Sequence, residues 1–156
     1  MEEAASAMET PVRGLVLRLQ NLQAKRSKAF QLLNEGHRAY LNSGPHYDFP
    51  RYRQLVHEVT EVFVSISQEV LEIQDQLRGS RGHPDLAQHL TRLQDKERER
   101  LELTAAMQLA RQRAREELGA EVLQEEEQEL KNRIIKTMEA ISEILQDLKY
   151  DSEETE

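Results

Sequence analysis

The feature that most constrains this chain is a regular stripe of apolar residues in its second quarter. Eight positions are spaced alternately by four and three residues without a gap: Tyr52, Val56, Val59, Phe63, Ile66, Val70, Ile73 and Leu77. This spacing keeps all their side chains on one face of an α-helix, as in coiled coils. Leu55 and Val62 widen the stripe, which favours packing against two helices. The stripe therefore predicts a helix of roughly 40 Å with one buried face.

A similar heptad pattern precedes this stripe. Its positions are Leu15, Leu19, Leu22, Arg26, Ala29, Leu33, Gly36 and Tyr40. Two of them are weak, because Arg26 is charged and Gly36 has no side chain. The sequence Asn-Ser-Gly-Pro at residues 42–45 is a strong signal for the end of a helix. Because the connection is short, we expect residues 12–78 to form an antiparallel helical hairpin.

A Gly- and Pro-containing linker at residues 79–84 separates the hairpin from a long, charged, coiled-coil-type region at residues 85–149. Past Gly119, this region carries a further apolar seam: Leu130, Ile134, Met138, Ile141, Leu145 and Leu148. We expect either one continuous helix of about 100 Å or a helix pair bent near Gly119. A continuous helix would have nothing in this chain to pack on over its far half. The seam residues are therefore candidates for binding a partner.

The composition fits an all-α fold. Charged residues make up 32% of the chain and aromatic residues only 4%, which suits long helices that each bury a stripe. Residues 1–11 and 150–156 are acidic ends that we expect to be disordered. No signal peptide is visible and no apolar stretch could span a bilayer. We therefore expect a soluble intracellular protein, nuclear or cytoplasmic, without membrane contact.

Patterns that support catalysis are missing from the sequence. It has no Gly-rich phosphate loop or nucleophile elbow, and the absence of cysteine excludes thiolate chemistry. His57 with Glu61, and Asp85 with His89, have i, i+4 spacing, but two ligands do not make a metal site. The net charge of −8 and the lack of a large basic face argue against direct nucleic-acid binding. We expect no enzyme, no cofactor and no metal.

Four of the seven aromatic residues gather around the expected hairpin turn: Tyr40, Tyr47, Phe49 and Tyr52. One interpretation is a set of rigid anchors for a partner peptide. The other is a cap that closes the end of the hairpin. Together with the six seam residues, these aromatics form the candidate partner-binding set. The partners would be proteins, including helical ones, or a second copy of this chain held through its C-terminal helix.

The hairpin also resembles a known family. The resemblance lies in Leu32-Leu33, Arg38-Ala39-Tyr40-Leu41, Gly44-Pro45, Tyr47, Tyr52, Leu55, Thr60, Phe63, Ser67 and the stretch from Ile66 to Leu77. It is similar to the required for excision 1-B domain family, named for a role in DNA excision repair, over about residues 15–115. The resemblance implies a non-enzymatic adaptor that acts through helix-mediated protein contacts. The alternative is a structural coiled-coil subunit of a cytoskeletal or trafficking assembly.

Overall fold

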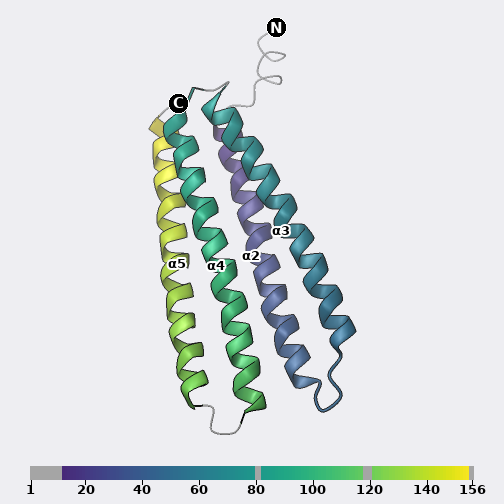
Figure 1. Cartoon of the computed structure of the whole chain (residues 1–156). Coiled ribbons are helices and arrows are strands. Elements are labelled where there is room, and N and C mark those ends of the chain that lie inside the picture. The colour runs from purple at the N-terminus through teal and green to yellow at the C-terminus, as the bar shows by residue number, and fades with distance from the viewer. Residues whose placement is uncertain (1–11, 80–81, 118–120, 155–156) are drawn as a thin grey trace.

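The computed structural model describes residues 12–79, 82–117 and 121–154. They form four helices: α2 (Val12–Asn42), α3 (Phe49–Arg78), α4 (Pro84–Glu116) and α5 (Glu121–Glu154). Consecutive helices run antiparallel beside one another (Figure 1). The described residues contain no strand, and the predicted all-α fold is confirmed.

The turn between α2 and α3 is held by polar side chains at both of its ends. Ser43 Oγ donates a hydrogen bond of 2.6 Å to the Tyr40 carbonyl and accepts one of 3.1 Å from the Asp48 backbone N–H. The Asp48 carboxylate in turn accepts from the Arg51 N–H at the start of α3. Pro50 occupies the first turn of α3, where the missing N–H has no helical partner to lose.

The region after the linker forms two helices, so the alternative of one continuous helix is wrong. α4 ends at Glu116 and α5 returns beside it; Gly119 and its neighbours lie outside the described residues (Figure 1). Polar contacts join the two helices near both ends. Arg111 donates to Glu127 at 2.6 Å, and His89 Nε2 lies 2.7 Å from an Asp151 carboxylate oxygen.

The structure describes most of the acidic C-terminal end of the chain but not the acidic N-terminal end. α5 continues to Glu154, so residues 150–154 are helical where we expected a disordered tail. The expectation for residues 1–11 lies outside the described part of the chain.

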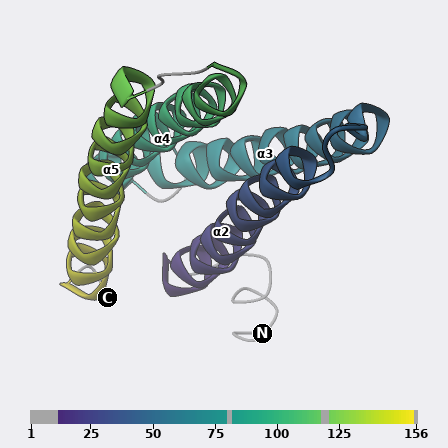
Figure 2. The ribbon, with the colours of Figure 1, turned by 90° about the horizontal axis from the view of Figure 1, so that it is seen from below.

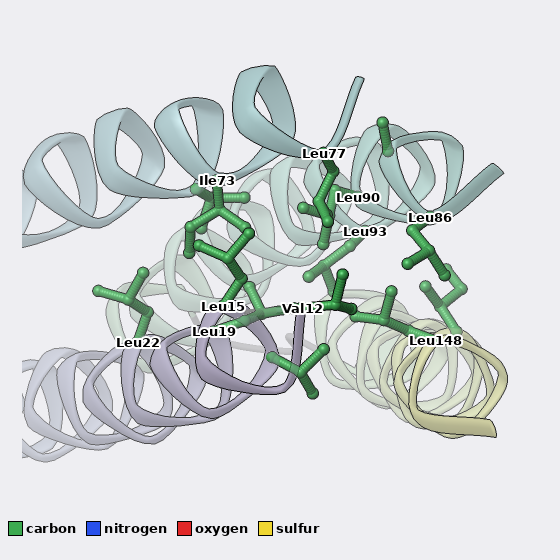
Figure 3. Close-up of a cluster of buried hydrophobic side chains, with 14 of the residues drawn as sticks. Val12, Leu15, Leu19, Leu22, Ile73, Leu77, Leu86, Leu90, Leu93 and Leu148 are labelled. Carbon is green, nitrogen blue, oxygen red and sulfur yellow. The ribbon is translucent and has the colours of Figure 1, made fainter. Parts of the chain in front are cut away.

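All four helices share one apolar core at the end of the bundle that holds the start of α2 and the end of α5. Its buried members are Val12, Leu15, Val16, Leu19, Leu22, Ile66, Val70, Ile73, Leu77, Leu86, Ala87, Leu90, Leu93, Ile141, Ile144 and Leu148. Their side chains point toward one another from all four helices (Figure 3). Each fully buried leucine contributes about 1.5–3 kcal/mol to folding. This end of the molecule therefore carries most of the apolar stabilisation.

Toward the other end, the α2–α3 and α4–α5 hairpins diverge and the core divides (Figures 1 and 2). One small cluster contains Ala29, Leu33 and Val59, with Leu55, Val56, Phe63 and Leu101 packed against it. The other contains Leu103, Met107, Ala110 and Leu130, with Ile134 beside it. Polar contacts between α2 and α4 bridge the gap, including Gln108 to Asn34 at 3.0 Å and Arg115 to the Leu41 carbonyl at 3.1 Å.

The two weak positions of the first heptad pattern are both filled. At Gly36, a Cβ would overlap Cδ2 of Leu55, so the missing side chain makes room for a leucine of α3. At Arg26, the guanidinium enters a buried polar layer rather than solvent, and its side chain is only 3% exposed.

Candidate protein-interaction site

The four aromatic residues predicted around the turn form a single cluster. Tyr40 lies at its centre, with ring-centroid distances of 4.8 Å to Tyr52, 5.4 Å to Tyr47 and 6.3 Å to Phe49. The Tyr40 and Tyr52 rings are stacked, with 21° between their planes. We call this cluster the aromatic end.

The aromatic end has an inner and an outer pair. Tyr40 and Tyr52 are half-buried and link α2 to α3, as a cap would. Tyr47 and Phe49 are 49% and 54% exposed, which is high for side chains this large. The Tyr47 ring lies against Gly44, where a Cβ would come within 2.8 Å of Tyr47 Cζ. Glycine at that position therefore lets the ring rest on the turn.

A hollow of about 370 Å³ lies beside the inner pair. Leu32, Ala39 and Leu55 give it apolar walls, and Leu32 is itself 39% exposed. Glu35, Asp48 and Arg51 supply charge of both signs to its lining. Apolar walls with a few polar groups are the usual character of a pocket that takes a side chain of a partner.

A buried polar layer crosses the bundle where the large core ends. Glu97 is 6% exposed and lies 3.4 Å from Arg26 and 3.6 Å from Arg100. Gln23 donates to Glu97 at 2.9 Å, and Arg26 donates to Gln94 at 3.0 Å. The contacts of Arg26 and Gln23 with Glu97 reach its Oε2. Oε1 instead has Arg100 at 3.6 Å and no hydrogen-bond partner among the described residues. The layer therefore joins α2 to α4 through paired charges.

This layer was not predicted, although its signals were present in the sequence. Arg26 stood in a heptad position, and Glu97 stood in the charged stretch of residues 95–100, which has no apolar seam. A charge in a core position of one helix is costly unless a facing helix supplies an opposite charge. Arg100 also lies over the Phe30 ring, 3.9 Å from its centroid.

His37 is a further buried ionisable group, on α2 near the aromatic end. It is 1% exposed, its ring lies 5.7 Å from the Tyr52 ring, and Nδ1 has no hydrogen-bond partner among the described residues. Burial lowers the pKa of the His37 imidazole, and the positive charges of Arg111 and Arg115 act in the same direction. The folded protein therefore holds His37 neutral.

The candidate seam of the last helix is largely part of the fold. Leu130, Ile141 and Leu148 are 8%, 5% and 2% exposed, because α5 packs against the rest of the bundle. In the folded chain these three side chains therefore do not form an accessible surface, and their role in binding a partner stays a prediction. A second copy could reach them only if α5 left the bundle.

The other three seam residues lie at the edges of the clusters. Ile134 and Leu145 are half-buried, each packed against a core cluster. Met138 is 42% exposed.

The histidine pairs noted in the sequence make simple contacts. His57 lies 3.1 Å from Glu61 on an exposed face, while His89 pairs with Asp151 rather than with Asp85. Within the described residues, no three His, Asp or Glu side chains gather as metal ligands. None of the described helices is long and apolar enough to cross a membrane.

Comparison with known proteins extends the resemblance seen in the hairpin. The sequence profile of the family described as DNA repair REX1-B matches residues 14–111. A Bos taurus protein named "Required for excision 1-B domain-containing protein" is 50% identical over 148 residues, covering 95% of this chain and 81% of that protein. The Mus musculus protein of the same name is 44% identical over 155 residues, covering 99% and 89%. No solved structure matches this chain.

Proposed function

Because the chain belongs to the DNA repair REX1-B family, we propose that it is a non-catalytic adaptor of DNA excision repair that works through protein contacts. The family description associates the family with DNA repair and names no reaction. A compact helical bundle fits an adaptor, since rigid helices hold surface side chains in fixed positions. The proposed place of action is the nucleus.

The observation that carries the adaptor role is the outer pair of the aromatic end. Tyr47 and Phe49 are about half exposed, yet both rings lie against a fixed neighbour, Tyr40. Rigid aromatic side chains lose little conformational freedom when a partner covers them, so they make strong binding anchors. The adjoining hollow of about 370 Å³ offers room for an apolar side chain of that partner.

The test compares three forms of the tagged chain in cells after local ultraviolet damage. The unchanged chain should gather at the damaged sites. The double variant Tyr47→Ala/Phe49→Ala should gather far less, because loss of an aromatic anchor typically weakens binding by about 2 kcal/mol or more, roughly 30-fold. Tyr150→Ala is the matched control, because Tyr150 is 64% exposed on α5 and lies outside the aromatic end.

Two results would contradict the proposal in different ways. Equal recruitment of the double variant and the unchanged chain would show that the aromatic end is not the contact surface. Unchanged survival of depleted cells after ultraviolet and oxidative damage would remove the repair role. Separately, the purified chain should not shift duplex DNA in a gel even at low salt, since its net charge is −8.

A further inference from the structure

A second hollow lies between α2 and α5, and α4 forms its floor. It measures about 370 Å³. Its apolar lining includes Met107 from α4 and Ile134, Ile135 and Met138 from α5. Ile135 and Met138 are 53% and 42% exposed, so this apolar surface is open to solvent.

A smaller hollow lies farther along the same two helices. Nearer the start of α2, a hollow of about 260 Å³ lies between the same two helices, and its lining includes Leu17 and Lys149. Leu17 is 54% exposed. On α2, Leu17 of the smaller hollow and Gln31 of the larger one are about 21 Å apart along the helix. We call the surface from one hollow to the other the groove between α2 and α5. A partner helix of four turns is long enough to reach both hollows.

Most of the charged side chains that line the two hollows are basic, whereas the whole chain is acidic. Lys131 and Arg100 are the charged residues of the larger hollow, and Arg13, Lys149 and Glu153 are those of the smaller one. Basic side chains thus outnumber acidic ones here, although the chain has a net charge of −8. A concentration of one sign in a groove favours a partner of the other sign.

Lys131 is the cation best placed to meet a partner. Its side chain is 45% exposed, and its Nζ lies 3.9 Å from a Glu127 oxygen. That same oxygen already receives Arg111 at 2.6 Å, so Lys131 is a weak second contact. Arg100, by contrast, is held between Glu97 and the Phe30 ring.

We propose that the groove between α2 and α5 binds an amphipathic helix of a partner protein, with acidic residues beside its apolar stripe. The apolar stripe covers Ile134, Ile135 and Met138, and an acidic side chain pairs with Lys131. This surface is separate from the aromatic end. Its occupant is defined by chemistry alone and does not depend on a role in repair.

The probe is a synthetic 18-residue amphipathic helix with a leucine stripe flanked by glutamates; the matched peptide carries lysines instead. The full chain is labelled on isoleucine and methionine methyl groups for NMR titration. The acidic peptide should shift the methyl signals of Met107, Ile134, Ile135 and Met138, and leave Ile66 and Ile73 in place. Its affinity should fall as salt rises, and the lysine peptide should bind at least tenfold more weakly.

Two variants separate charge from apolar contact. Lys131→Glu should weaken the acidic peptide at least tenfold, and Ile135→Asn should weaken both peptides. The matched charge control is Arg53→Glu, an exposed change on α3 outside the groove, which should leave the affinity within about twofold. Circular dichroism checks that each variant is folded.

Several outcomes would overturn the proposal. They are equal binding of the two peptides, unchanged binding by Lys131→Glu, and methyl shifts confined to other faces. Concentration-dependent shifts of the same methyls, with dimers in light scattering, would assign the groove to a second copy instead. If deleting residues 1–9 shifts these methyl signals without any peptide, the groove is instead occupied by the chain's own acidic N-terminal segment.

Discussion

Glu97 lies between the guanidinium groups of Arg26 and Arg100, in a layer with little access to water. In such surroundings the balance of charge matters more than the number of contacts. Burial lowers the pKa of both arginines, and the negative charge of Glu97 opposes that effect. The carboxylate thus offsets part of the cost of burying two cations.

Replacing Glu97 alone should therefore be costly. Glu97→Leu leaves two buried guanidinium groups without a counter-charge and should lower the free energy of unfolding by about 3–5 kcal/mol. The double variant Arg26→Leu/Glu97→Leu removes one of those cations and should be more stable than the single variant by at least about 1 kcal/mol. Urea unfolding followed by circular dichroism gives both values. If the loss of stability in the double variant equals the sum of the losses in Glu97→Leu and Arg26→Leu, the two residues do not act as a pair.

His37 should give the fold a dependence on mild acid. Its pKa in the folded chain is lowered from the ordinary 6.5 by burial. Below about pH 6.5, His37 binds a proton in the unfolded chain but stays neutral in the folded chain. The free energy of unfolding therefore falls as the pH falls. Above that pH both states are neutral and the full stability is present.

The measurement is urea unfolding between pH 7.5 and 5.5. His37→Gln should remove much of the pH dependence, whereas His57→Gln, which changes an exposed histidine, should retain it. If the two variants lose the dependence equally, the buried imidazole is not its source.

The helices show which part of the fold is readable from sequence. Periodicity identified the buried face of α3, because all eight positions of its stripe are buried or half-buried. The hairpin turn was readable from Gly44 and Pro45. Periodicity cannot say what a buried face packs against, however. The seam of α5 therefore suggested an unpaired arm, although the structure places it in the common core.

The role of α5 in the core can be tested by one substitution at three sites. Ile73→Asp and Ile141→Asp each place a charge in the same core cluster and should each cost about 3 kcal/mol or more. Ile135→Asp, on the same helix as Ile141 but 53% exposed, should cost about 0.5 kcal/mol or less. Thermal unfolding curves compare the three. A folded hairpin that survives Ile141→Asp intact would mean that α5 is an independent arm.

The whole molecule combines one dense end with one divided end. All four helices meet in the large core, while the two hairpins diverge toward their turns (Figure 2). The aromatic end was predictable, because its four residues are neighbours in sequence. The groove between α2 and α5 was not, since it combines residues as distant as Leu17, Met107 and Lys131.

The central claim is that α5 folds back beside α4 and completes the bundle, so that its apolar seam is part of the core. A distance between the start of α4 and the end of α5 tests it directly. The chain has no cysteine, so Gln88→Cys and Tyr150→Cys, both at exposed positions, can carry spin labels without background. Double electron–electron resonance should give a distance below roughly 30 Å, as for neighbouring helices about 10 Å apart with flexible labels. A distance near 90 Å, that of one continuous helix, would contradict the account.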